Sequence, residues 1–88
     1  MRKEELEKIL KALANRRRLS IVAYLKRVGK AKVGDIAFEL QLSFAATSRH
    51  LVILERTGIL DKEQRSTEVF YYLADLRNLF VMELIVEL

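Results

Sequence analysis

The side chains with the clearest chemical potential in this chain lie on one predicted helix, residues 43–56. Ser48 and Arg49 project from its polar side, because a helix turns by about 100° per residue. The opposite side carries an apolar stripe formed by Thr47, Leu51 and Leu54. An arginine can bind a guanine edge or a phosphate, and a serine hydroxyl can bond either a base or a backbone group. The outward face therefore predicts contact with a nucleic acid, and for Arg49 base reading and phosphate binding both stay open.

The first turn of the same helix adds apolar groups. Phe44 and Ala45 follow Ser43, and both could touch the methyl group of a thymine. For Phe44 the favoured alternative is packing inside the turn that precedes the helix. Ser43 is expected to cap the helix by accepting a hydrogen bond from a free backbone N–H, and it is also counted among the contact residues.

Further basic residues are expected to contact backbone phosphates, which positions a protein on a duplex without reading its sequence. They are Arg56, Lys62 and Arg65, at the end of the helix and in the segment after it. Arg16 and Arg17 open an earlier helix, whose N-terminus favours anions. Residues 15–32 carry a charge of +7 with no acid, whereas the remaining residues sum to −3 and the whole chain to +4. This asymmetry indicates a phosphate-facing patch, with a solvated basic face as the alternative.

Short helices are needed to position these groups. Apolar residues at helical spacing predict helices over residues 3–14, 15–28, 33–40, 43–56 and 76–88, with Asn15 and Asp75 as caps. Gly58 is expected to end the fourth of these helices, because glycine adopts the left-handed C-terminal turn with little strain. The third and fourth helices, joined by a tight turn, then have the layout of a helix-turn-helix.

A hairpin follows the fourth helix in the predicted order. Residues 60–64 and 68–73 are its strands, and the second is dense in aromatic and β-branched residues. Arg65, Ser66 and Thr67 form its polar tip, and residues 30–32 are a candidate third strand. The expected fold is mainly α with a small β-wing, a winged helix-turn-helix in which residues 43–56 are the recognition helix.

Size and composition limit the classes of protein to consider. The 88 residues are expected to form one domain, residues 1–88, with 51% apolar residues and no cysteine. The lack of cysteine removes disulfides, thiolate metal sites and thiol redox sensing. The first residues lack the apolar core of a signal peptide, and no apolar run reaches the ~18 residues that span a bilayer. A cytoplasmic protein without membrane contact is therefore expected.

The last predicted helix is apolar on nearly every side. Nine of the residues in 75–88 are apolar, and one small domain cannot cover them all. The favoured explanation is a two-fold homodimer in which residues 1–14 and 75–88 are the dimerisation helices. Its predicted interface consists of Leu6, Ile9, Leu10, Leu79, Phe80, Met82, Ile85 and Val86. The alternative is that the helix crosses its own core and leaves an ordinary apolar patch.

The chain resembles the arsenic-repressor-like (ArsR) family of winged-helix transcription regulators in three segments. They are ALANRRRLSIVAYL, VGDIAFELQLSFAATSRHLVILERTGIL and EVFYYL, in this order, and residues 48–60 are the most specific part. The resemblance covers about residues 10–73. It implies a homodimer built from the first and last helices, with residues 43–56 as the recognition helix and residues 61–70 as the wing. It also implies sequence-specific binding to a double-stranded DNA operator, usually as a repressor that a signal releases.

The chain departs from this family at the family's metal sites. Val33, Gly34 and Asp35 stand where the family's metal sensors have paired cysteines, and the last helix has no histidine. Metal sensing is therefore disfavoured, no cofactor is expected, and the effector is left open. Gln41 and Ser66 stand where the family often has glycine.

Two further residues carry alternatives. His50, the one histidine, is expected to bond phosphate or backbone at the rim of the recognition helix, as the resemblance suggests, rather than a metal. Arg18 matches a position where the family usually has arginine. It either binds phosphate or forms a structural ion pair with Asp35 or Glu39.

The leading hypothesis is a dimeric regulator that binds double-stranded DNA on a near-palindromic site, its recognition helices about one DNA turn (~34 Å) apart. The alternative is a protein-interaction module that meets a partner through Phe44, Ala45 and Val52, or a nonspecific DNA-binding module. An enzyme is rejected, because the sequence has no paired general acid and base, nucleophile constellation or phosphate-cradling loop.

Overall fold

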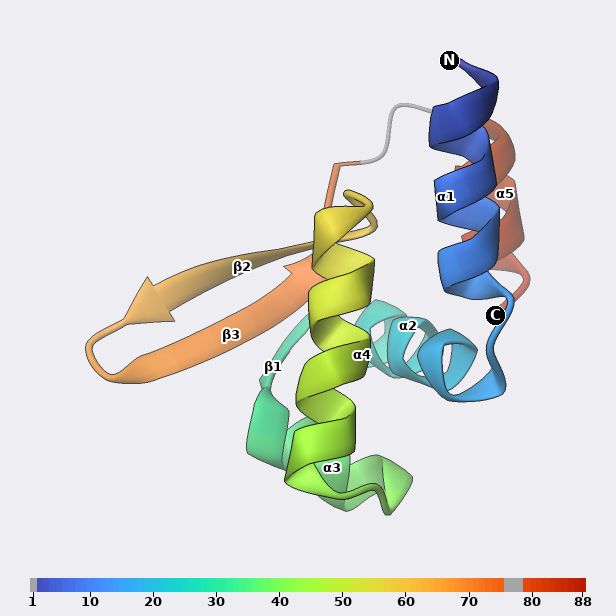
Figure 1. Ribbon diagram of the computed structural model, residues 1–88. Helices are drawn as coiled ribbons and strands as arrows, with labels where there is room; N and C mark the ends of the chain where they lie inside the picture. The colour runs from blue at the N-terminus through green and yellow to red at the C-terminus, as the bar shows by residue number, and fades with distance from the viewer. Residues whose placement is uncertain (1, 76–78) are drawn as a thin grey trace.

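The computed structural model describes residues 2–75 and 79–88, and the side chains of Leu79 and Phe80 are outside the described groups. The elements follow in the order α1 (Lys3–Leu13), α2 (Arg16–Val28), β1 (Lys30–Lys32), α3 (Val33–Leu40), α4 (Phe44–Arg56), β2 (Leu60–Arg65), β3 (Glu68–Leu73) and α5 (Leu79–Val86). Figure 1 shows the β2–β3 hairpin extending away from the helices, with α1 and α5 side by side at the opposite end. The predicted winged helix-turn-helix is confirmed.

The two ends of α4 are stabilised by the residues that the sequence placed there. The Ser43 hydroxyl oxygen accepts a hydrogen bond from the backbone N–H of Ala46 at 3.1 Å. At the other end, the N–H groups of Gly58 and Ile59 donate to the carbonyls of Glu55 and Leu54. Gly58 has a φ of +80°, the left-handed conformation that this Schellman motif needs. Both predicted ends are therefore confirmed.

The turn from α3 to α4 uses the same motif without a glycine. Gln41 has φ 54° and ψ 46°, which is left-handed, and its N–H donates to the carbonyl of Phe38. The N–H of Leu42 donates to the carbonyl of Ala37 at 3.0 Å. A left-handed residue with a side chain is strained by about 1–2 kcal/mol, so the two hydrogen bonds hold Gln41 in a costly conformation.

A three-stranded antiparallel sheet carries the wing. Its strand order is β1-β3-β2, with Ala31 opposite Tyr71 and Lys62 opposite the same tyrosine on the other side. The hairpin turns at Ser66 and Thr67, and Ser66 has a φ of +59°. Tyr71 is buried and Tyr72 is half-buried, with the Lys30 ammonium 5.4 Å from the centre of the Tyr72 ring. The third strand predicted over residues 30–32 is confirmed, and it ties the wing to the helices.

One apolar core holds all five described helices and the sheet together. Its fully buried side chains include Ile21 of α2, Ile36 of α3, Leu51 and Leu54 of α4, and Val81 of α5. The last helix is shorter than predicted, because α5 ends at Val86 rather than at residue 88. The predicted cap at Asp75 and the predicted helical residues 76–78 cannot be compared, since 76–78 lie outside the described residues.

Candidate nucleic-acid interface

The outward face of α4 is open to solvent over its whole length. Ala45, Arg49 and Arg56 are exposed, and Ser48 and Val52 are half-buried. The opposite side of the helix is fully buried and consists of Thr47, Leu51 and Leu54. This division follows the predicted helical spacing and leaves one face with methyl, hydroxyl and guanidinium groups and no carboxylate.

Phe44 is exposed, and the prediction that it packs inside the turn is wrong. Its side chain remains 63% accessible at the first position of α4. The apolar stripe of the helix begins three residues later at Thr47, so the core does not reach the first turn. Phe44 instead borders an open cleft of about 460 Å³ between the start of α3 and the tip end of the wing, where Gly34, Asp35 and Val69 also lie.

The charged side chains of α4 are two arginines, Arg49 and Arg56, and one acid. Glu55 is the one acid in the helix, and its carboxylate lies 3.1 Å from the Lys62 ammonium of β2. This carboxylate raises the pKa of Lys62 through a hydrogen bond and its charge. Among the described residues, Arg49 and Arg56 form no ion pair, so their guanidinium groups are available to an anion.

Arg18 joins three helices from a half-buried position. Its Nε donates to the carbonyl of Ala12 and its Nη2 to the carbonyl of Lys11, both at the end of α1. Its Nη1 lies 3.3 Å from Nδ1 of His50 on α4. The alternative of an ion pair with Asp35 or Glu39 is wrong, because Arg18 points toward α1 and α4, and Glu39 pairs with Arg27 at 3.2 Å.

His50 is the point where the recognition helix meets this arginine. Desolvation by burial is the first cause that lowers the pKa of His50, and the charges of Arg18, Arg17 and Arg49 lower it further. The ring is therefore neutral at pH 7, with Nδ1 placed to accept from Arg18. Its observed partner is a guanidinium, which differs from the phosphate or backbone group that the sequence suggested. The same charges show that Arg17 of α2 and Arg49 of α4 lie close enough to act on one ring.

The basic segment of residues 15–32 is not a single anion-facing patch. Only Arg16 and Arg17 of its seven cations are exposed without a partner among the described residues. Besides Arg18, four cations of the segment bind groups of the protein. Lys26 donates to the Val86 carbonyl, and Arg27, Lys30 and Lys32 form ion pairs with Glu39, Glu63 and Glu68, respectively. Acids that fold against the segment thus pair with three of its seven cations, Arg27, Lys30 and Lys32.

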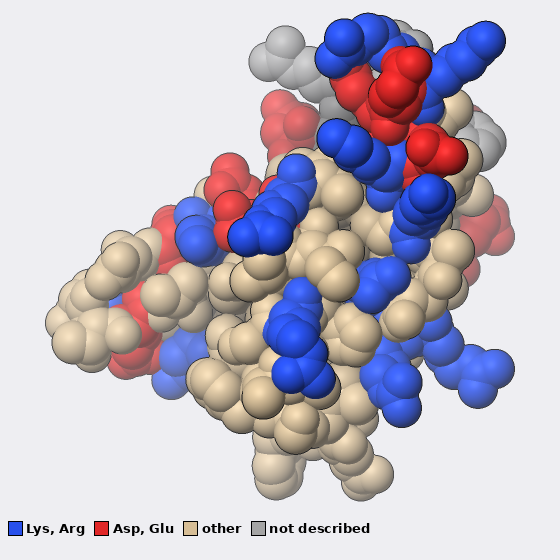
Figure 2. Space-filling view, viewed as in Figure 1, with Lys and Arg blue, Asp and Glu red and all other residues tan. Residues whose placement is uncertain are grey.

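The basic side chains of the wing are also paired with acids of the protein. Arg65 lies 2.9 Å from the Glu63 carboxylate, and Lys62 is paired with Glu55. Figure 2 shows basic side chains along α4 and over α1, whereas acidic side chains on this face lie along the hairpin and at the top of α1. A phosphate contact by Lys62 or Arg65 stays a prediction, and it requires these exposed ion pairs to exchange partners, which is a small change in free energy.

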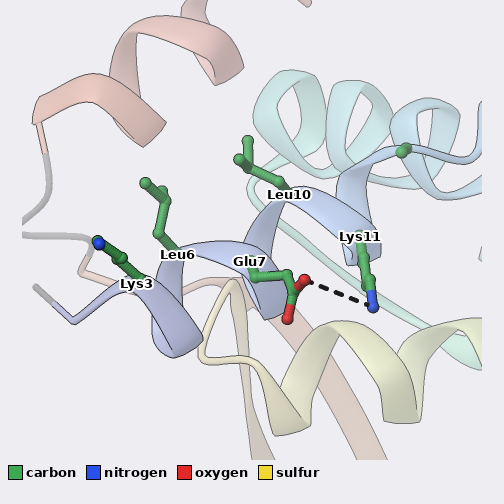
Figure 3. Close-up of a pocket in the computed structure, with 6 residues that line it drawn as sticks. Lys3, Leu6, Glu7, Leu10 and Lys11 are labelled. Atoms are coloured by element: carbon green, nitrogen blue, oxygen red, sulfur yellow. Dashed lines mark ion pairs between the residues drawn. The ribbon is translucent and has the colours of Figure 1, made fainter.

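A second surface lies on α1 and α5, away from the outward face of α4. Figure 3 shows Leu6 and Leu10 extending from one side of α1, with the Glu7–Lys11 ion pair of 3.8 Å beside them. The exposed apolar side chains here are Leu10, Met82, Leu84, Val86 and Leu88. Ile9 and Ile85, predicted for the dimer interface, are 8% and 6% exposed and already belong to the core of one chain. Leu79 and Phe80, also predicted there, lie outside the described side chains.

Sequence reasoning missed two contacts that shape this site. The Arg18–His50 contact joins residues 32 positions apart, and the Glu55–Lys62 pair joins a helix to a strand. Neither has a local sequence signature, although the family's usual arginine at position 18 was a signal that this side chain matters.

In residues 2–75 and 79–88 no group of three or more His, Cys, Asp or Glu side chains could hold a metal ion. Across the same residues, no helix has the length and apolar character that a bilayer crossing requires.

Known proteins share this sequence pattern. The family described as "Bacterial regulatory protein, arsR family" matches residues 15–62. The transcriptional activator HlyU of Vibrio cholerae is 36% identical over 77 residues, which cover 88% of this chain and 70% of that protein. The cadmium resistance transcriptional regulatory protein CadC of Listeria innocua is 35% identical over 74 residues, covering 84% of this chain and 62% of that protein.

Solved structures share the fold. HlyU from Vibrio cholerae matches with a TM-score of 0.82 at 34% identity, covering 99% of this chain and 92% of that chain. A homodimeric winged helix-turn-helix DNA-binding domain from Mycobacterium bovis, a possible ArsR-family regulator, matches with a TM-score of 0.81 at 27% identity. That match covers 96% of this chain and 74% of the Mycobacterium bovis chain. The relatives are transcription regulators, which points to a non-enzyme.

Proposed function

The chain belongs to the arsR family of bacterial regulatory proteins, and from this premise we propose that it binds a near-palindromic DNA operator as a homodimer. In the proposal, α4 lies in the major groove and reads base edges with Ser48 and Arg49. The first and last helices join the two copies. A two-fold dimer presents its recognition helices about 34 Å apart, which is one turn of DNA.

One observation carries the proposal, the outward face of α4. This face holds Arg49 and Arg56 without ion pairs to described residues, and the one carboxylate of the helix is neutralised by Lys62. Arg17 of α2 is also exposed, and its charge acts on His50 of α4, so it adds positive charge near this helix. Such a face can approach a polyanion without the repulsion that an unpaired acid would cause.

The dimer is supported by apolar area that one chain leaves uncovered. Met82, Val86 and Leu10 are 43%, 68% and 40% exposed, and they lie on the two helices that Figure 1 shows side by side. A small domain gains stability when a second copy covers such area. The related domain from Mycobacterium bovis is described as homodimeric, which agrees with this expectation.

The proposal includes repression. A dimer that occupies an operator excludes other proteins from the same duplex, and the sequence resemblance implies a repressor released by a signal. The Vibrio cholerae relative is named an activator. A reporter gene placed behind the selected operator therefore decides between repression and activation of transcription. Lower expression with the protein present supports repression, and higher expression assigns activation instead.

A titration of duplex DNA at several salt concentrations tests the binding proposal. For the wild type, the logarithm of the affinity should fall linearly with the logarithm of the salt concentration, by about 0.9 per phosphate contact. Arg49→Ala should weaken binding by about 1–3 kcal/mol per half-site if it reads a base, and the loss should depend on sequence. A loss that is equal on all sequences, with a shallower salt slope, would make Arg49 a phosphate contact.

Arg27→Ala is the matched control for this titration. Arg27 is also exposed, but it pairs with Glu39 and lies on α2 rather than α4. Its removal should change the DNA affinity less than twofold. A protein that retains no duplex at low salt would overturn the proposal and favour the second candidate.

The second candidate is a protein-interaction module, and exposed aromatic residues favour it. Phe38 on α3 and Phe44 on α4 are 87% and 63% exposed at either side of the turn that joins these helices. A partner protein that covered them would bind with little dependence on salt, since no counterions are released. The salt titration therefore separates the two candidates.

A further inference from the structure

We propose that Phe44, together with Ala45, reads the methyl group of a thymine in each half-site of the operator. The inference rests on the proposed function and names the base class that this part of the recognition helix selects. It starts from an observation that the sequence did not predict, namely that the ring of Phe44 is 63% exposed at the first turn of α4.

The chemistry of the two side chains restricts what they can recognise. Phe44 and Ala45 have no hydrogen-bond donor or acceptor in their side chains, and both are exposed. In the major groove, adenine, guanine and cytosine present polar groups, whereas thymine adds a methyl group. An apolar side chain gains by covering a methyl and loses by desolvating a polar edge that it cannot bond. The pair therefore favours thymine and disfavours the other bases.

The neighbouring groups of α4 fix the register of this contact. The Ser43 hydroxyl oxygen is already occupied as the helix cap, so the first reading positions fall to Phe44 and Ala45. Arg49 follows Ala45 by four residues, a rise of about 6 Å, which matches about two base steps. If Arg49 binds a guanine, the thymine read by Phe44 and Ala45 should lie within about two base pairs of that guanine.

The carboxylates near Phe44 make a phosphate an unsuitable occupant of the adjoining cleft. Asp35 borders this cleft, and Glu68 lies there in an ion pair of 2.9 Å with Lys32. A phosphate in this cleft would meet two carboxylates and only one cation, Lys32, which already pairs with Glu68. A base edge in the groove is neutral, so an apolar side chain can contact it at this end of α4 without needing a counter-charge.

Uracil substitution tests the inference on a duplex that the wild-type protein selects from a random pool. Replacing a thymine by uracil removes only the methyl group. For the wild type, the substitution at the contacted thymine should weaken binding about fourfold, the effect of one buried methyl, and about fifteenfold when both half-sites are changed. Uracil at the remaining thymines should have no effect.

Two variants of Phe44 connect the effect to this residue. Phe44→Ala should bind the thymine and uracil duplexes within twofold of each other, because the covering ring is gone. Phe44→Gln keeps a helix-compatible side chain and should lose the preference for thymine as well. Phe38→Ala is the matched control, since Phe38 is an even more exposed aromatic on α3, and this variant should keep the wild-type penalty for uracil.

The outcomes separate the inference from the function on which it rests. If the wild type recovers an operator but tolerates uracil at every thymine, the inference is overturned and the operator-binding proposal stands. If Phe44→Ala keeps the uracil penalty, the methyl is read by another residue, which also overturns it. If no duplex is retained by the wild type, the proposed function itself fails, and the exposed ring is then available to a protein partner.

Discussion

Removal of the Arg18 guanidinium should destabilise the protein without reducing its direct contact with DNA. Arg18→Ala deletes a bond to the Ala12 carbonyl at 2.5 Å and two longer contacts of 3.3 Å, to the Lys11 carbonyl and to His50 Nδ1. A hydrogen bond that involves a charged group is worth about 1.5–3 kcal/mol, and a cation at a helix C-terminus about 0.3–1 kcal/mol. The two long contacts and the partial exposure of the site reduce their share.

Together these contributions predict a loss of about 2–4 kcal/mol in the free energy of unfolding. For a domain of this size the loss corresponds to a fall of roughly 10–25 °C in the midpoint of thermal unfolding. Arg18→Lys should lose about half as much, because one ammonium keeps the charge near the α1 carbonyls but cannot reach three acceptors. Urea unfolding followed by circular dichroism, at several protein concentrations, separates this effect from a change in dimerisation.

Arg17→Ala is the internal control for this measurement. Arg17 neighbours Arg18 in the sequence but is exposed and has no ion pair with a described residue. Its removal should change the free energy of unfolding by less than about 0.5 kcal/mol and should weaken DNA binding instead. Equal stabilities for Arg17→Ala and Arg18→Ala would refute the structural role assigned to Arg18.

Three further predictions concern the turn, the histidine and the dimer surface. Gln41→Gly should raise the free energy of unfolding in urea by about 0.5–1 kcal/mol, because glycine removes the left-handed strain and this gain exceeds the extra entropy that glycine gives the unfolded chain. Gln41→Ala keeps the strain and should not stabilise the fold. Stability should begin to fall as the pH drops below about 6.5, because the folded state lowers the pKa of His50 and the unfolded chain binds the proton first. His50→Gln should remove this part of the pH dependence between pH 7.5 and 5.5, and an unchanged profile would assign it to other groups. Met82→Glu should shift the protein from dimer to monomer in sedimentation while leaving its circular dichroism unchanged, since Met82 is exposed in one chain; a persistent dimer would place the interface elsewhere.

The fold could be predicted because its determinants are local. The cap at Ser43, the buried stripe of Thr47, Leu51 and Leu54, and the turn at Gly58 are each read from a few neighbouring residues. Such signals depend on the 3.6-residue period and on backbone conformation, which operate within one helix. The winged helix-turn-helix followed from their order along the chain.

The details of the site could not be predicted because they depend on contacts between distant elements. The basic segment looked like one patch in sequence, but Lys30 and Lys32 pair with acids of the wing. Arg18 binds acceptors on α1 and α4 rather than the carboxylates of Asp35 or Glu39, which the sequence had left as one of two alternatives. Phe44 is exposed because the core ends one turn above it, a limit that hydrophobicity alone does not reveal.

The dimer surface could be predicted from the sequence only in part. The excess of apolar residues on the last helix predicted that something covers it, and Met82 and Val86 are indeed exposed in one chain. Two of the predicted interface residues do not belong there, because Ile9 and Ile85 are buried in the core of one chain. An apolar residue on a terminal helix can face either its own core or a partner, and periodicity does not distinguish the two.

Selection of bound duplexes from a random DNA pool, at physiological salt, tests the central claim most directly. We expect an inverted repeat whose half-sites are centred about one helical turn, roughly 10–10.5 base pairs, apart. Each half-site should contain a guanine for Arg49 and a nearby thymine for Phe44. Recovery of unrelated sequences by a folded, dimeric protein would contradict operator recognition and leave nonspecific DNA binding. Recovery of no DNA would contradict the role of α4 as a reading helix.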